Sequence, residues 1–306
     1  MKRLLTLVLS LGLASAAFAH APEGVVHQAF QWPAGTEPTL DGDLSEWEIV
    51  PDDYRIPFSI CLDGEGNPPT DFSDLNSEVI VGWSESENKL YVMDQRFDDF
   101  YDRDGVGGGA GGDDTIEMHH DGDHGGEPFW VSGDDFPDAD ERALNMGRYA
   151  QTYHTRFPDL PGSTGEGGET WAWFWVSQST WHDAPEYMDR GFQIDGQLNQ
   201  GEATVYIEFN RVMWDEFIWN DPGASVQHDL TEENIIGLGW MFGDQDGSGT
   251  NEEKPPVETW FMSGAADAWK TSASASDFLL APVDPRVDFT AVEEDSWGRI
   301  KEAFVK

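Results

Sequence analysis

The stretch Asp-Asp-Thr-Ile-Glu-Met-His-His-Asp, residues 113–121, decides the predicted fold. In a β-strand, successive side chains point to opposite faces. One face then carries Thr115, Glu117, His119 and Asp121, and the other carries Ile116 and Met118. A strand with one apolar face and one face of carboxylate and imidazole is typical of a β-sandwich wall that displays a polar site.

Similar alternating segments recur along the chain and are separated by clusters of Gly, Asp, Asn and Pro. They cover residues 79–83, 89–95, 115–119, 171–177, 203–210, 235–243 and 257–263. Short strands at this spacing predict an all-β fold, an antiparallel, jelly-roll-like β-sandwich with long loops. Residues 86–88 predict a tight hairpin turn. A short helix over 210–217, capped by Asn210, and an amphipathic C-terminal helix over 293–304 are also expected.

The N-terminus has the pattern of a secretory signal. Lys2 and Arg3 precede an apolar run over 4–17, and Ala-Phe-Ala at 17–19 forms a cleavage site. No later stretch approaches about 20 apolar residues, so no membrane span is expected. We therefore expect an exported protein, secreted or periplasmic. It comprises a signal at 1–19, one β-sandwich domain at 20–285 with an insertion near 131–168, and a tail at 286–306.

The chain is strongly acidic, with 59 Asp and Glu against 17 Lys and Arg and a formal net charge of −42. Such a surface repels nucleic acid and anionic membranes, so neither is an expected partner. Two interpretations of the charge stay open: solubility in saline media, and binding of hard cations such as calcium. The single cysteine, Cys61, cannot form an internal disulfide, and its acidic surroundings predict an inert thiol.

An oxygen-rich loop at 244–252 could hold a cation. Calcium takes six to eight oxygen ligands from flexible loops, and Asp244 and Asp246 could supply some of them. Asp98 and Asp99 precede a glycine-rich run at 105–112 and could supply a second set. The alternative in both places is a solvated acidic turn.

A histidine-rich segment offers a second kind of metal site. His119, His120 and His124 lie close to acidic residues, as in a zinc or copper cluster. His119 and His120 would point to opposite faces of a strand, however, so the two cannot readily serve one ion.

Fourteen tryptophans are many for this length. Trp171, Trp173 and Trp175 alternate and therefore share one face of a strand. That face could be an exposed platform on which sugar rings stack, or a buried strand face, because large aromatic side chains mostly serve packing.

Five motifs occur in order along the chain. They are Pro-Thr-Leu-Asp-Gly-Asp-Leu-Ser-Glu-Trp at 38–47, Leu-Tyr-Val at 90–92 followed by Asp98 and Asp99, Asp114-x-x-Glu117 ending in Asp121, Tyr206-x-Glu208 leading into 209–214, and Asp244-x-Asp246 followed by Trp260. This order resembles carbohydrate-binding module family nine and its wider bacterial relatives.

The resemblance implies a jelly-roll-like β-sandwich, bound calcium and a sugar-binding cleft with aromatic walls. It makes Glu117 a polar sugar contact and Trp260 or Trp269 an aromatic wall. His119, on the same face as Glu117, and Trp173 and Trp175 are further expected ligand contacts. The expected metal ligands are Asp98, Asp99, Asp114, Asp244 and Asp246. The expected function is non-catalytic binding of a poly- or oligosaccharide by a calcium-stabilised, exported protein, which could accompany glycan-degrading enzymes.

Two other functions stay open. Relatives of this fold include the haem-b-binding, electron-transfer subunits of periplasmic molybdenum dehydrogenases, which ligate haem through Met and Lys; here Met118 or Met241 with Lys254 or Lys270 could serve. A glycoside hydrolase is the third hypothesis, although no acid/base pair stands out among so many carboxylates.

Overall fold

The structure is a computed structural model, and it describes residues 21–104, 113–158, 171–172, 181–247, 257–262, 268 and 270–289. The expected signal at 1–19, the glycine-rich run at 105–112 and the C-terminal helix at 293–304 lie outside these residues. So do Trp173, Trp175, Lys254 and Trp269. In the described part of the chain, every helix is too short or too polar to cross a bilayer.

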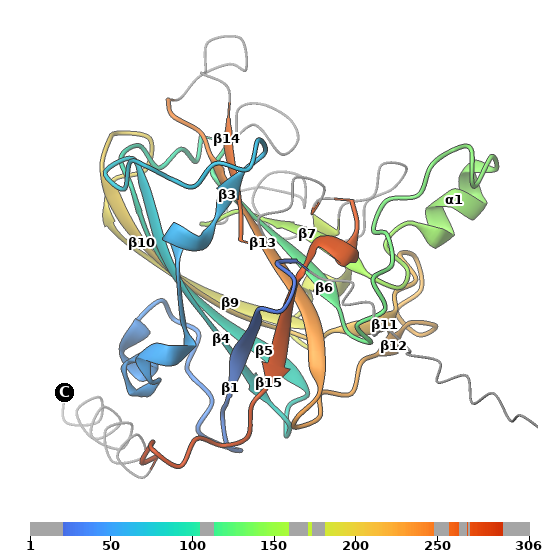
Figure 1. The fold of residues 1–306 in the computed structure, drawn as a ribbon, viewed down its shortest axis with the longest axis horizontal. Coiled ribbons are helices and arrows are strands. Elements are labelled where there is room, and N and C mark those ends of the chain that lie inside the picture. The colour runs from blue at the N-terminus through green and yellow to red at the C-terminus, as the bar shows by residue number, and fades with distance from the viewer. Residues whose placement is uncertain are drawn as a thin grey trace, which may run out of the picture.

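Two β-sheets pack face to face (Figure 1). The first, sheet A, follows the spatial order β8 (Trp171–Ala172), β7 (Gln151–Thr155), β6 (Thr115–Asp121), β13 (Ile235–Asp244) and β15 (Ser276–Leu280). Beyond the end of β15, β13 pairs instead with β14 (Glu258–Phe261), which also pairs with the short β3 (Leu62–Asp63). The sheet is antiparallel throughout these pairings.

The second sheet, sheet B, is also antiparallel. Its strands are β2 (Arg55–Pro57), β4 (Leu75–Ser84), β5 (Lys89–Asp98), β10 (Ala203–Arg211) and β9 (Met188–Gly196). The strand β1 (Val26–Gln31) joins the sheets, because residues 26–29 pair in parallel with β15 and residues 30–31 pair in parallel with β4. The sandwich is therefore antiparallel except along β1.

Short elements cover the ends and the outer faces. They are η1 (Leu44–Ile49), η2 (Asp52–Tyr54), η3 (Phe58–Ile60), α1 (Ala139–Asn145), η4 (Trp181–Asp183), η5 (Ser272–Ser274), and a two-stranded sheet of β11 (Trp214–Glu216) and β12 (Val226–Gln227). The segment predicted as an insertion at 131–168 thus contributes α1 and also β7, which is a strand of sheet A.

The core lies between the two sheets. Ile116 and Met118 of β6 are buried in it together with Val92 and Ile207 from sheet B, while Glu117 points to the opposite face. The predicted all-β sandwich and the predicted alternation along 113–121 are both confirmed. Cys61 belongs to the same core, and burial, with a smaller contribution from Asp94, raises the pKa of its thiol to about 12.

The predicted helix at 210–217 is wrong. Asn210 continues the ladder of β10, with Tyr91 and Asp189 as its neighbours on the two adjacent strands. Its side-chain oxygen accepts a hydrogen bond from the Asp189 backbone N–H at 2.8 Å and does not cap a helix. The next residues form β11, whose Trp214 is buried in a separate aromatic cluster. Strand pairing and tertiary packing therefore override the local helical signal.

Candidate functional site

Three buried carboxylates converge at one end of the sandwich interior. Asp98 ends β5 of sheet B, Asp244 ends β13 of sheet A, and Asp114 immediately precedes β6. One carboxylate oxygen from each lies within 4.8 Å of the others, although the three side chains are at most 3% exposed. The cluster thus lies where strand ends of the two sheets meet, and all three of its members are acidic.

The electrostatics of this cluster are unfavourable for charged carboxylates. Burial, and then repulsion from Asp98, raises the pKa of Asp244 to about 8. Burial is also the largest cause that raises the pKa of Asp98 to about 6 and the pKa of Asp114 well above its usual value. The positive charge of Arg96 lowers these three pKa values, but its effect is smaller than that of burial. An additional positive charge would stabilise the ionised forms.

Some oxygens of the cluster are already used and others are free. Asp114 accepts hydrogen bonds from the backbone N–H groups of Asp102 at 2.5 Å and Gln245 at 2.8 Å. Asp98 accepts one from Phe100 N–H at 2.9 Å through Oδ1, while its buried Oδ2 has no hydrogen-bond partner. An unpartnered carboxylate oxygen that points among other carboxylates is an arrangement that suits a hard cation.

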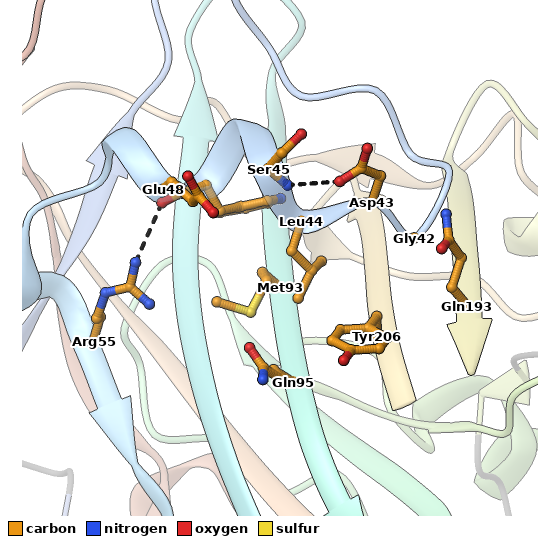
Figure 2. A pocket seen from close by; sticks show the side chains of 11 residues that line it. Gly42, Asp43, Leu44, Ser45, Glu48, Arg55, Met93, Gln95, Gln193 and Tyr206 are labelled. Atoms are coloured by element: carbon orange, nitrogen blue, oxygen red, sulfur yellow. Dashed lines mark hydrogen bonds between the residues drawn. The ribbon is translucent and has the colours of Figure 1, made fainter. Parts of the chain in front are cut away.

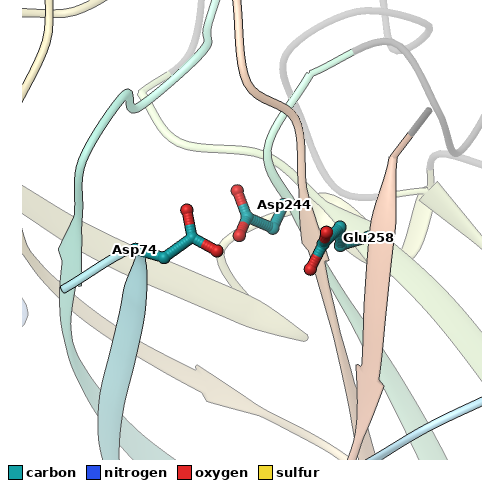
Figure 3. A group of neighbouring side chains, drawn as sticks. All are labelled: Asp74, Asp244 and Glu258. Carbon is teal, nitrogen blue, oxygen red and sulfur yellow. The ribbon is translucent and has the colours of Figure 1, made fainter. Parts of the chain in front are cut away.

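A more exposed set of acidic groups continues outward from the buried cluster. Figure 3 shows Asp74 and Glu258 beside Asp244, and Asp74 also groups with Asp99 and Asp246. Burial and repulsion from Asp99 raise the pKa of Asp246 to about 6. The structure therefore brings together all five predicted metal ligands, and the sequence missed Asp74 and Glu258. Two separate acidic groups comprise Asp102, Asp104 and Asp113, and Asp121, Asp123 and Glu127.

The predicted sugar contacts on β6 are buried. Glu117 is 1% exposed and His119 is 0% exposed, on the face of sheet A that points away from the core. Glu117 Oε1 lies 2.8 Å from Nε2 of His154, which stands directly opposite on β7. Burial raises the pKa of Glu117, but His154 and His119 outweigh it and lower the pKa to about 2. Their part in sugar binding stays a prediction.

The other predicted ligand contacts lie apart from one another. Trp260 sits on the core side of β14, where its ring is 5.6 Å from that of Phe58. Met118 is buried between the sheets, whereas Met241 lies on the outer face of sheet A opposite Glu117. Lys270 is exposed. No described contact joins either methionine to this lysine.

An open groove lies on the outer face of sheet B. The segment that carries η1 crosses this face and is fixed there by Glu208 of β10, which is buried. Glu208 accepts hydrogen bonds from Trp47 Nε1 at 2.7 Å and from Gly42 N–H at 2.7 Å. The Asp41 N–H adds a longer one at 3.2 Å. Beyond η1 the sheet face is uncovered, and the groove runs along this boundary (Figure 2).

The floor of the groove is a row of side chains across the sheet. Gln95 on β5, Tyr206 on β10 and Gln193 on β9 are direct cross-strand neighbours, and Glu78 on β4 extends the row. Asp43, Ser45 and Glu48 from the η1 segment form one wall, and Arg55 lies beside this wall, near Glu48 (Figure 2). The cavity has a volume of about 430 Å³, and a second hollow of about 320 Å³ adjoins it at Gln95.

Part of this groove was predictable from the sequence motifs. Tyr206 and Glu208 belong to one of the five motifs and Asp43 to another, but neither Gln95 nor Gln193 stands out among polar residues. The cross-strand row depends on the pairing register of β5, β10 and β9, which places Gln95 beside Tyr206 although the two are more than 100 positions apart.

No protein-family model and no curated protein matches the sequence. Among solved structures, the chain is similar to a family 9 carbohydrate-binding module from Caldicellulosiruptor kristjanssonii in complex with cellotriose, with a TM-score of 0.46 and 13% identity over 84% of this chain and 96% of that chain. The glucose complex of a family 9 module from the same organism gives 0.42 and 13% over 86% and 98%. A Bacteroides uniformis protein provisionally assigned as carbohydrate-binding gives 0.45 and 6% over 84% and 98%.

Proposed function

We propose that this chain is an exported, non-catalytic carbohydrate-binding protein that is stabilised by calcium. The observation that carries the proposal is the open groove on sheet B, with Tyr206 at the centre of a row of amide side chains. Export rests on the signal pattern at 1–19.

The groove has the chemistry that a neutral sugar requires. The half-buried Tyr206 ring offers a face against which the C–H groups of a pyranose can pack. Gln95 and Gln193 flank it and offer both donors and acceptors, which match sugar hydroxyl groups. The volume of about 430 Å³ lies within the roughly 300–1,000 Å³ of small-molecule sites.

The charges along the groove favour neutral over anionic glycans. Asp43 and Glu48 line the groove, and Arg55, the cation beside them, already pairs with Glu78. A uronic acid or sulfated sugar would meet the negative carboxylates of Asp43 and Glu48 there and would be repelled. We therefore expect neutral oligosaccharides as ligands.

Calorimetry against a panel of neutral oligosaccharides tests the proposal. We expect binding by the wild type and its loss in Tyr206→Ala, because the stacking surface is removed. Tyr149→Ala is the matched control, since Tyr149 is an exposed tyrosine outside the groove. No heat with any glycan, or equal binding by Tyr206→Ala, would contradict the proposal.

The calcium part of the proposal rests on the buried cluster of Asp98, Asp114 and Asp244. A hard divalent cation would offset their mutual repulsion and would connect the two sheets in a chain with one cysteine and hence no internal disulfide. A melting temperature that rises with added calcium and falls with a chelator is the expected result. An identical melting temperature under both conditions would exclude a stabilising ion.

A further inference from the structure

The outer face of sheet A brings two histidines and one glutamate together around a buried point. His119 and Glu117 both come from β6, two residues apart and on the same face. His154 comes from β7 and stands directly opposite Glu117 in the ladder. His154 is therefore diagonal to His119, a separation of about 7–8 Å between strand positions that long side chains can bridge.

Glu117 lies close to both histidines of this group. Glu117 Oε1 is 2.8 Å from His154 Nε2, and Glu117 Oε2 is 3.6 Å from His119 Nε2. Two ligands at zinc bond lengths of about 2.1 Å and a tetrahedral angle are about 3.4 Å apart. The two contacts use different oxygens of Glu117, so the two imidazole rings would have to rotate toward each other for all three side chains to bind one ion.

Several polar atoms of His119, Glu117 and their neighbours on this face are buried without the partners that such atoms usually have. Both ring nitrogens of His119 and the Oε2 atom of Glu117 lack a hydrogen-bond partner, although the two side chains are 0% and 1% exposed. The hydroxyl oxygens of Thr115 and Thr152, on the same face, lack one too. Unpartnered buried polar atoms cost free energy, so their concentration at one point indicates a missing ligand.

The neighbouring strand leaves room for the imidazole rings. Gly239 on β13 stands opposite His119, and a Cβ atom at this position would lie 2.9 Å from His119 Nδ1. Gly243 stands opposite Thr115 in the same strand, and a Cβ there would lie 2.7 Å from its hydroxyl oxygen. A side chain at either glycine would press on the polar group, so the strand is shaped to accommodate it.

We propose that His119, His154 and Glu117 form a buried site for one divalent transition-metal ion of the zinc type. Imidazole nitrogen with a carboxylate is a ligand set that suits zinc and its neighbours in the periodic table, whereas calcium prefers oxygen alone. The site is separate from the acidic cluster, which offers only carboxylates. His120 is excluded because it turns to the other face of β6, where its ring contacts Tyr153.

Zinc titration of the purified full chain tests this site. The chain is first stripped with a chelator and then held in excess calcium, which occupies the acidic cluster. We expect one equivalent of tightly bound zinc. His154→Gln and His119→Gln should weaken the affinity more than about 100-fold, because changing even an outer partner of a metal ligand costs 10–100-fold. His228→Gln should bind as the wild type, since His228 pairs with Asp215 instead.

A spectroscopic measurement on the unmodified chain covers the case in which the glutamine variants fail to fold. Cobalt substituted for zinc should give visible absorption bands of a low-coordinate ion, and X-ray absorption should show imidazole scattering. Absence of imidazole scattering, or equal zinc affinity in the wild type and a folded His119→Gln/His154→Gln double variant, would overturn the proposal. Sugar binding at sheet B is measured separately, so either proposal can fail without the other.

Discussion

Trp47 donates a hydrogen bond from its indole Nε1 to Glu208 Oε1 at 2.7 Å, across 161 positions of the sequence. The contact joins two of the motifs that resemble a carbohydrate-binding family, the segment 38–47 and the Tyr206-x-Glu208 strand. Glu208 is fully buried and accepts further hydrogen bonds from Gly42 and Asp41. Both motifs therefore serve first to fix one wall of the groove, and only Tyr206 and residues of η1 face the ligand space.

Replacing Glu208 should destabilise the fold in proportion to the acceptors removed. Glu208→Ala leaves the Trp47 indole N–H and two backbone N–H groups without an acceptor, at a cost of about 1–3 kcal/mol for each buried donor. Glu208→Gln retains one carbonyl oxygen and should cost less. Denaturant unfolding measures both, and a wild-type free energy of unfolding for Glu208→Ala would contradict this anchoring role.

Gly42 should not tolerate a side chain. Its φ of +81° favours glycine, and a Cβ atom would lie 2.5 Å from the backbone nitrogen of Gln193. Gly42→Ala must therefore both strain the backbone and push η1 away from β9. We expect a loss of stability together with weaker sugar binding, measured by unfolding and calorimetry.

Gly35→Ala is the matched control for this substitution. Gly35 has nearly the same φ, +82°, but a Cβ there would meet no atom within 4 Å. It should lose only the cost of the left-handed conformation, about 1–2 kcal/mol. Equal losses in the two variants would show that the close approach to β9 contributes nothing.

The strands with regular alternation were predictable, and the site was predictable only in part. In β6, Ile116 and Met118 mark the core face, so the position of Glu117 followed from period alone. In β9 the apolar pair Phe192 and Ile194 is preceded by Gly191, which resembles a turn. In the structure this glycine does not form a turn. A side chain is excluded at Gly191 because a Cβ atom there would lie 2.4 Å from the Asp41 backbone nitrogen.

Contacts between distant strands have no local signal. His154 lies in a polar segment, Gln-Thr-Tyr-His-Thr, whose strand character comes from pairing with β6. Gln95 is brought to Tyr206 by the pairing register of β5 and β10, not by sequence proximity. By contrast, Asp98, Asp114 and Asp244 each lie at or next to the end of a strand that the sequence pattern predicts. The carboxylates of the acidic cluster could therefore be predicted from the sequence.

Without calcium, stability should fall as pH rises. Burial raises the pKa of Asp244 to about 8 and the pKa of Asp98 to about 6, from the ordinary aspartate value of 3.8. The folded state therefore binds protons that the unfolded state has released, and this contribution is fully present below pH about 4 and lost as pH rises to about 8. Melting temperatures in chelator should thus decline across this window.

Calcium should reverse that trend, because it replaces the protons on the same carboxylates. Its stabilising effect should be larger at pH 8 than at pH 5, and binding at pH 7 should release protons, which calorimetry in buffers of different ionisation enthalpy detects. Asp244→Asn should be more stable than the wild type in chelator at pH 8 and should respond less to calcium. Asp195→Asn, an exposed change on β9, should leave both properties unaltered. A calcium effect independent of pH would contradict a role for these buried carboxylates.

Two substitutions decide which face of the sandwich contacts sugar. Gln95→Ala removes one amide beside Tyr206 from an exposed position and should weaken glycan binding about tenfold, roughly the 1.4 kcal/mol of a hydrogen bond, with little effect on folding. Glu117→Gln alters only the buried group on sheet A, so it should leave glycan affinity unchanged while lowering stability, because His154 loses its ionic partner. The opposite pattern, with affinity lost in Glu117→Gln and retained in Gln95→Ala, would place the sugar on sheet A, as the resemblance implied, and would require that face to open before it binds.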